Sequence, residues 1–470
     1  MGMADSSASK RYLGVFALTM INFAAIMNLR NLPLLSFYGL GMIFFYLVAA
    51  LLFFIPAALI SAELASIFDE EGGLFAWVSH AIGERAAFVC GWISFITTVT
   101  ALTMTIIFLA KSMLLAVIPV ESQNKGVVCA AVICVVWTAT FLALKGINFT
   151  SKIVSVASTV GTMLPAFLLV ALGIYWWCSG DAIAMDTSPQ TILPDFSNFS
   201  NVSFITGVMF GFAGIEMSAY YIKNVKNPRK TYPRAIFLAT GTILLVSLLG
   251  SLAIAVVIPR SEISIEAGAM QAIVVVLESM GLGRVSQTIS SLMLIGGTAY
   301  IFSWIAGPAM GLYATRNDGF LPKFLLKTNA RGMPVAILGV QAALVTILAI
   351  LSLFVQSTDL FFWIIDVTSS VMMLMLYACL FISGIVLRYK MPEANRLYKV
   401  PWGNFGMILL ACVAIANVIF CMITSFFIPN DLQDKMSQSR FACVVSVLTL
   451  LLLGPALIFT LRRQKPCTKG

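Results

Sequence analysis

The sequence contains little charge and almost no histidine. Of its 470 residues only 10% are Asp, Glu, Lys or Arg, against about 25% in an ordinary soluble protein. A water-exposed surface cannot be made from so few charges, so a soluble globular protein is excluded. His80 is the only histidine, which also excludes a histidine-based metal cluster and a proton relay made of histidines alone.

Cysteine chemistry is lacking as well. The nine cysteines include no C-x-x-C pair and mostly fall within apolar segments, so neither a disulfide framework nor a metal site is indicated. No set of residues resembles a nucleophile with its base. We therefore expect no enzyme activity, no cofactor and no bound metal.

Hydrophobic runs dominate instead. The chain is 60% hydrophobic with a mean hydropathy of +0.97, and apolar segments of roughly 20 residues, enough to cross a bilayer, recur along it. They predict an all-α integral membrane protein, a single polytopic domain over 1–470, with 178–201 and 259–285 as ordinary loops. The twelve predicted spans are 13–37, 42–68, 86–118, 127–147, 153–177, 202–222, 235–258, 286–314, 334–356, 360–388, 404–428 and 441–461.

Lys and Arg set the predicted orientation. Most of the 29 lysines and arginines fall in connections on the side of the N-terminus, and this side is therefore predicted to be cytoplasmic. Both termini then lie in the cytoplasm, and the net charge of +9 follows from topology, with no nucleic-acid partner. The opposite side carries Lys125, Arg260, Arg284, Lys435 and Arg440.

Two spans are interrupted by residues that a straight, lipid-facing helix would not contain. Residues 22–28 read Asn-Phe-Ala-Ala-Ile-Met-Asn and 211–217 read Gly-Phe-Ala-Gly-Ile-Glu-Met, each in the first span of a five-span block, 13–177 and 202–388. An odd number of spans inverts the second block, so the broken helices 1 and 6 are predicted to meet near the midplane. Residues 404–461 supply two additional helices.

The backbone N–H and C=O groups that lose their helical partners at such breaks can bind a free amino acid. Its carboxylate matches exposed N–H groups and its ammonium matches freed carbonyls. The alternative is that Gly211 and Gly214 only let helices pack closely. Glu216, a carboxylate inside the second apolar run, and the presence of a break in both blocks favour a site.

Several motifs resemble the amino acid-polyamine-organocation superfamily. The stretch 210–216, Phe-Gly-Phe-Ala-Gly-Ile-Glu, followed by Val225-Lys-Asn-Pro, is similar to its sixth-span signature. Leu29-Arg-Asn-Leu-Pro, Glu71-Gly-Gly-Leu-Phe-Ala-Trp and Ser303-Trp-Ile-Ala-Gly-Pro are similar to its glutamate/γ-aminobutyrate exchanger branch. The resemblance implies a leucine-transporter-type fold, alternating access, and exchange or proton-coupled uptake of amino acids.

The resemblance also implies a substrate site, with aromatic gates at Phe210 and Trp304. A re-entrant loop is implied at 71–77, and the acidic residues around it suggest either a solvated face or an inward gate that pairs with basic loops. The implied substrate-binding residues are Ala24, Ala25, Ile26, Met27 and Asn28 in the first break, Phe210, Gly211, Phe212, Ala213, Gly214 and Ile215 in the second, and Trp304.

Four ionisable residues are candidates for coupling or gating. Glu216 is the first choice, because burial disfavours the charged form of a carboxylate; otherwise it is a permanently ionised partner of Lys223. Arg30 either meets the substrate carboxylate or extends to the outer interface, and for Lys111 we expect the latter. Asp366 either pairs with one of these two cations or takes up a proton.

The function indicated is a secondary amino acid antiporter, of glutamate/γ-aminobutyrate or neutral amino acid type. Alternatives are a proton-coupled symporter and the transport or sensor subunit of a larger membrane complex. The partners expected are an amino acid, protons and membrane lipid, in a monomer or homodimer. The location expected is the cell membrane, the inner membrane if the source is bacterial. Which amino acid is transported cannot be read from these residues.

Overall fold

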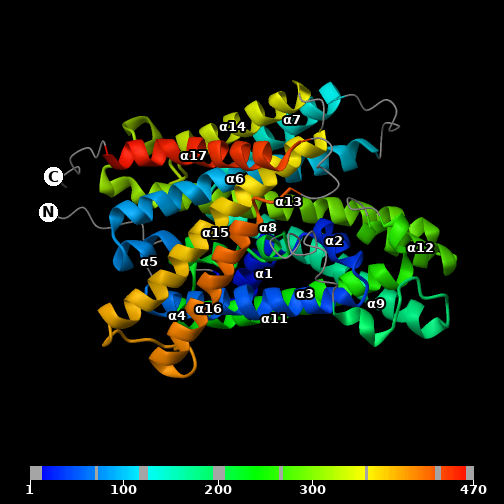
Figure 1. Ribbon diagram of the computed structural model, residues 1–470. Coiled ribbons are helices and arrows are strands. Elements are labelled where there is room, and N and C mark those ends of the chain that lie inside the picture. Colours follow the sequence, from blue (N-terminus) through cyan, green and yellow to red (C-terminus); the bar gives the residue numbers. More distant parts are fainter. Residues whose placement is uncertain are drawn as a thin grey trace.

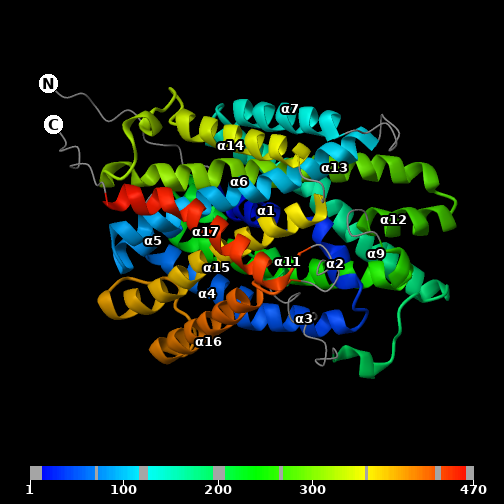
Figure 2. The same ribbon diagram turned by 45° about the horizontal axis from the view of Figure 1, so that its top comes forward.

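The described part of the molecule is a bundle of helices. The computed structural model describes residues 13–68, 72–115, 125–193, 207–263, 268–354, 358–428 and 436–461. Within these ranges the only strand-like pairings are two isolated bridges, Leu13 with Val225 and Thr328 with Pro334. Most helices run side by side along one direction (Figures 1 and 2).

Ten helical segments within the described ranges are long and apolar enough to cross a membrane. They match ten of the twelve predicted spans, and the two without such a helix, 13–37 and 202–222, are those predicted to be broken. The all-α membrane fold with broken helices 1 and 6 is thus confirmed. The spanning helices are α3 (Gly41–Ala49) with α4 (Ile55–Ile67), α6 (Glu84–Leu115), α7 (Lys125–Ala143), α8 (Ile147–Ser158) with α9 (Leu164–Ser179), α11 (Pro228–Val257), α13 (Gly283–Ala314), α14 (Val335–Phe354), α15 (Thr358–Lys390), α16 (Gly403–Thr424) and α17 (Gln438–Leu461).

Two spans contain a wide π-helical turn that the sequence analysis did not predict. These turns are η2 (Ala50–Phe54) and η4 (Thr159–Met163), and a proline, Pro56 or Pro165, follows each of them. A proline inside a helix removes one hydrogen bond and its ring clashes with the carbonyl four residues earlier. A local π turn relieves that clash without ending the span.

The prediction that 259–285 is an ordinary loop was wrong. This connection contains α12 (Gly268–Ser279), a helix with a buried face that includes Ala269, Ala272, Ile273 and Val276. These residues recur at spacings of three and four, the pattern of an amphipathic helix. The helix lies at the end of the bundle that is on the right in Figure 1, where it contacts α9 and α11.

At the opposite end of the bundle, a double glycine turn leads into the short helix α5 (Leu74–Ala81). Gly72 and Gly73 have φ of 113° and 53°, a backbone region that favours glycine. A Cβ on Gly73 would lie 2.9 Å from the Cβ of Ala219. The turn therefore packs directly against the segment that follows the break in span 6. Of the four acidic residues predicted for an inward gate, Asp69, Glu70 and Glu71 lie outside the described ranges, and Glu84 is the exposed first residue of α6.

A buried ion-pair network holds the connection between α15 and α16. Glu63 on α4 contacts the guanidinium groups of Arg388 (3.0 Å) and Arg396 (3.1 Å), and its carboxylate also accepts the backbone N–H of Val400. Arg396 further donates to the carbonyls of Leu387 and Met391, near the end of α15. The network joins two spanning helices and the connection that follows α15.

Replacing Glu63 by glutamine is expected to destabilise the protein strongly. The substitution leaves Arg388 and Arg396 buried without their carboxylate, and breaking a buried pair in this way costs about 3–5 kcal/mol. Thermal unfolding of the purified protein in detergent measures the effect. Glu278→Gln, at an exposed carboxylate on α12, is the matched control, and equal unfolding temperatures for the two variants would contradict the assignment.

Candidate functional site

Span 1 is interrupted at Met27 and Asn28. The helix α1 (Val15–Ile26) ends with Met27 in an extended conformation, ψ 99°. A short 3₁₀ turn, η1 (Leu29–Asn31), and α2 (Leu32–Ser36) follow. Ala24, Ala25 and Ile26, predicted to be unwound, instead form the last helical turn, whose carbonyls have no residue four positions ahead in the helix to accept from.

Span 6 is interrupted over 212–216. The helical turn that includes Phe210 and Gly211 ends there, and the chain continues as the 3₁₀ helix η6 (Met217–Asn224). Gly214 has φ 121°, which a side chain would disfavour. The break therefore falls where the spacing of the glycines predicts it.

The two breaks touch each other. A Cβ on Gly214 would lie 3.3 Å from Ile26 Cγ1, 3.3 Å from the ring of Trp304, and 3.5 Å from the Cβ of Ala25. The indole N–H of Trp304, on α13, donates to the carbonyl of Ala25 at 2.9 Å. The structure thus brings the last turn of α1, the unwound part of span 6 and the predicted aromatic gate into one cluster.

Glu216 is bound to a tyrosine from a distant helix. The hydroxyl of Tyr377, on α15, donates to the Glu216 carboxylate at 2.5 Å and accepts the backbone N–H of Gly214 at 2.7 Å. Both side chains are buried, whereas Lys223, the alternative partner considered for Glu216, is exposed. Tyr377 therefore links the break in span 6 to α15.

The 3₁₀ helix η6, which follows the break, packs against the face of α13 that carries Gly307 and Gly311. A Cβ on Gly311 would lie 2.4 Å from the ring of Tyr220, and one on Gly307 would lie 3.2 Å from it. The Tyr220 hydroxyl and the Ser94 Oγ of α6 are 3.1 Å apart, within hydrogen-bond distance. Together with the glycine turn at Gly73, these contacts close the bundle between the cluster and the end where α5 lies.

Replacing Gly311 by alanine is expected to loosen this closure. The added methyl cannot fit beside the Tyr220 ring, so the ring must move, at a cost of about 1–3 kcal/mol. Thermal unfolding measures the loss. Gly339→Ala, on α14, is the control, because nothing lies within 4 Å of a Cβ there; an unfolding temperature at Gly311→Ala as high as in this control would contradict the packing described.

Of the other predicted coupling residues, only Asp366 has a described side chain. It is half-buried on α15, one turn before Ser370, whose hydroxyl donates to its carbonyl. Nearby, the hydroxyls of Ser369 and Thr100 join α15 to α6 at 2.5 Å. The backbones of Arg30 and Lys111 lie in η1 and α6, and their side chains lie outside the described part.

The sequence analysis missed two functional or structural groups. Tyr377 lies in an apolar helix with no motif around it. The only signal was that a buried tyrosine hydroxyl usually has a hydrogen-bond partner. Glu63 had the same signal as Glu216, a carboxylate inside an apolar span, and was overlooked. Among the described residues, no group of three or more His, Cys, Asp or Glu side chains could hold a metal ion.

Two discontinuous helices that meet inside a bundle of long apolar spans are the arrangement of a secondary membrane transporter. The sequence model of the family described as "Amino acid permease" matches residues 13–452. The chain belongs to this family.

Relatives agree with the assignment. The chain is 34% identical to an uncharacterized transporter of Legionella pneumophila, over 98% of this chain and 99% of that protein. It is 27% identical to a glutamate/gamma-aminobutyrate antiporter of Lactococcus lactis, over 86% and 82% of the two chains. A solved manganese transporter of Eremococcus coleocola has a similar fold, with a TM-score of 0.61 at 10% identity over 98% of both chains. These comparisons are with transporters rather than enzymes.

Proposed function

We propose that this protein is an amino acid antiporter that works by alternating access. The observation that carries the proposal is the contact between the two breaks. There the carbonyl of Ala25 in α1 accepts the Trp304 indole and the N–H of Gly214 in span 6 donates to Tyr377, so both backbone groups bond to side chains and not within a continuous helix. The similarity to the glutamate/gamma-aminobutyrate antiporter supports exchange as the mode of transport.

The substrate would bind at the contact between the breaks. Its ammonium would take the carbonyls at the end of α1, in place of the Trp304 indole that bonds to Ala25 O. Its carboxylate would take N–H groups at the start of η1 (Leu29–Asn31), the first helical turn after the break. Trp304 and Phe210 would then cover the bound amino acid.

Glu216 would couple substrate binding to the movement of span 6 relative to α15. Its carboxylate and the Tyr377 hydroxyl tie span 6 to α15, so a proton on Glu216 would weaken a charge-assisted hydrogen bond at the gate. This buried carboxylate is also the observation that favours proton-coupled symport as a second candidate. Asp366 and Arg30 are proposed as further charged groups of the pathway, and Lys111 as a cation that extends to the outer interface.

The arrangement in the membrane is part of the proposal. Residues 13–177 and 202–388 would form inverted five-helix repeats, and 404–461 would add two helices. Both termini would face the cytoplasm of a bacterial cell, with the protein in the inner membrane as a monomer or homodimer.

Counterflow tests the proposal. Proteoliposomes are preloaded with single amino acids and scanned across pH for uptake of labelled amino acid. We expect uptake with a small set of acidic or neutral amino acids, and a lack of exchange with every amino acid tested would overturn the proposed function.

A further inference from the structure

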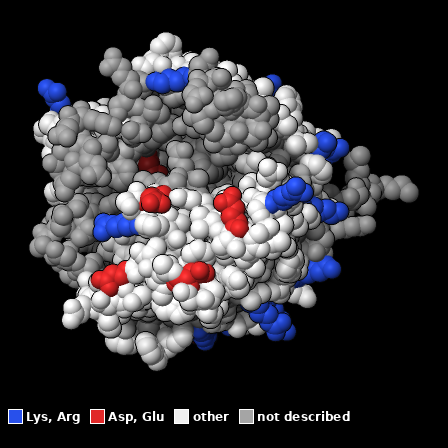
Figure 3. Space-filling view, turned by 90° about the vertical axis from the view of Figure 1, so that its right-hand side faces the viewer, with Lys and Arg blue, Asp and Glu red and all other residues white. Residues whose placement is uncertain are grey.

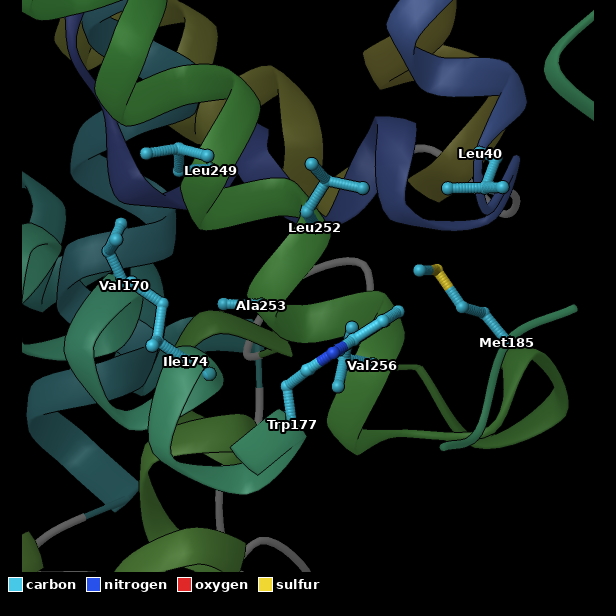
Figure 4. Close-up of a pocket in the computed structure, with 10 residues that line it drawn as sticks. Leu40, Val170, Ile174, Trp177, Met185, Leu249, Leu252, Ala253 and Val256 are labelled. Atoms are coloured by element: carbon cyan, nitrogen blue, oxygen red, sulfur yellow. The ribbon is translucent and has the colours of Figure 1, made fainter. Parts of the chain in front are cut away.

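An apolar groove lies between α9 and α11, near the end of the bundle away from α5. It has a volume of about 300 Å³, and its lining includes Val170 and Ile174 of α9 and Leu249, Leu252 and Val256 of α11 (Figure 4). Gly173 forms part of its floor, where a Cβ would lie 2.4 Å from the Cβ of Ala253. The backbones of α9 and α11 approach each other closely at Gly173 and Ala253, and the groove lies beside this contact.

The groove opens toward the membrane. Ile174 and Trp177, both on its rim, are 58% and 49% exposed, on the surface of helices that span the bilayer. An opening at this position faces lipid tails rather than water. A tryptophan at such a place is typical of the boundary between tails and head groups.

The connection that follows α9 covers one end of the groove. The backbone N–H of Ala184 donates to the carbonyl of Val256 at 2.9 Å, and the Trp176 indole donates to the carbonyl of Ala182 at 3.2 Å. Met185, from the same connection, and Leu40 line the groove on the same side (Figure 4). The groove is therefore closed above and open at its side.

One cation stands close to this end. Arg260 follows α11 by three residues and is exposed. Along the chain Arg260 follows Val256 of the groove lining by four residues. Burial raises the pKa of the Tyr38 hydroxyl to about 12, and the charge of Arg260 acts in the opposite direction. Tyr38 lies two residues from Leu40 in the groove lining. Figure 3 looks at this end and shows basic and acidic side chains scattered over it.

We propose that the groove binds one acyl chain of a membrane phospholipid whose phosphate pairs with Arg260. The apolar lining matches the tail. Because the tail is already out of water in the bilayer, its fit to the groove decides whether it stays there. The charge of Arg260 matches the phosphate and gives the position of the head group. The bound lipid would come from the leaflet away from the termini and would fill the space between α9 and α11.

Native mass spectrometry of the purified full-length chain tests the proposal. The probes are phosphatidylethanolamine and phosphatidylglycerol, added to delipidated protein in detergent. One tightly retained phospholipid is expected on the wild-type protein. Arg260→Gln should weaken its binding about fivefold, and Leu252→Trp, which fills the groove, should weaken it by more than about tenfold.

Two control variants distinguish lipid binding in the groove from lipid binding elsewhere on the membrane-facing surface. Leu245→Trp lies two turns from Leu252 on the same helix at a 51% exposed position, and Arg284→Gln removes another exposed cation at the same end; both should retain the lipid. Equal loss in Leu245→Trp and Leu252→Trp, or no retained lipid on the wild type, would overturn the proposal. Preference for one lipid over the other identifies the head group, and either preference supports the site.

Discussion

Replacement of Gly214 by alanine is expected to reduce amino acid exchange about tenfold to a hundredfold, because a non-glycine residue held at φ 121° costs about 1–3 kcal/mol. The added methyl would also press on Ile26 and on the Trp304 ring at 3.3 Å. Both breaks and the aromatic gate would be displaced together. Counterflow with the substrate found for the wild type measures the loss.

Gly207→Ala is the control for this variant. Gly207 lies in the same helical segment as Phe210, and nothing is within 4 Å of a Cβ there. Its exchange rate should remain close to that of the wild type. If Gly214→Ala transports as fast as Gly207→Ala, the contact between the breaks is not the substrate site.

Replacement of Glu216 by glutamine is expected to remove the pH dependence of exchange. In the wild type the ionised carboxylate accepts the Tyr377 hydroxyl, and this charge-assisted bond is stronger than one to a neutral group. Exchange should therefore rise as pH falls and the carboxylate takes up a proton. Glutamine cannot ionise, so the variant should keep a flat profile near the rate of the wild type at low pH.

Two tyrosine variants sharpen this experiment. Tyr377→Phe removes the hydroxyl that joins Glu216 to Gly214 N–H and should also flatten the profile. Tyr46→Phe keeps the ring that packs on Phe212 and removes only a buried hydroxyl, which lies 2.9 Å from Ser251 Oγ. This variant should leave the profile unchanged. A wild-type rate together with a wild-type pH profile in Glu216→Gln would show that Glu216 plays no part in coupling.

The fold was largely predictable because the bilayer demands long apolar segments. All ten long spans and the two interrupted ones could be found from hydropathy alone. The helix α12 was missed because its 12 residues are too few to cross the membrane. The π turns before Pro56 and Pro165 were missed because a proline in a span predicts a disturbance without showing its geometry.

The site was only partly predictable, since its residues come from segments far apart in the sequence. The glycines and Glu216 mark the break in span 6 locally, and the structure places it at 212–216. In span 1, where no glycine stands near the break, the break was predicted too early, at Ala24 rather than Met27. Tyr377, 161 positions from Glu216, could be paired with it only by the folded chain.

The central claim is obligatory exchange of amino acids, and a comparison of loaded and empty proteoliposomes tests it most directly. Uptake of labelled substrate is measured into liposomes that contain unlabelled amino acid and into liposomes that contain buffer, with and without a pH gradient. We predict uptake only into the loaded liposomes. Equal uptake into both, driven by the pH gradient, would contradict exchange and establish symport instead.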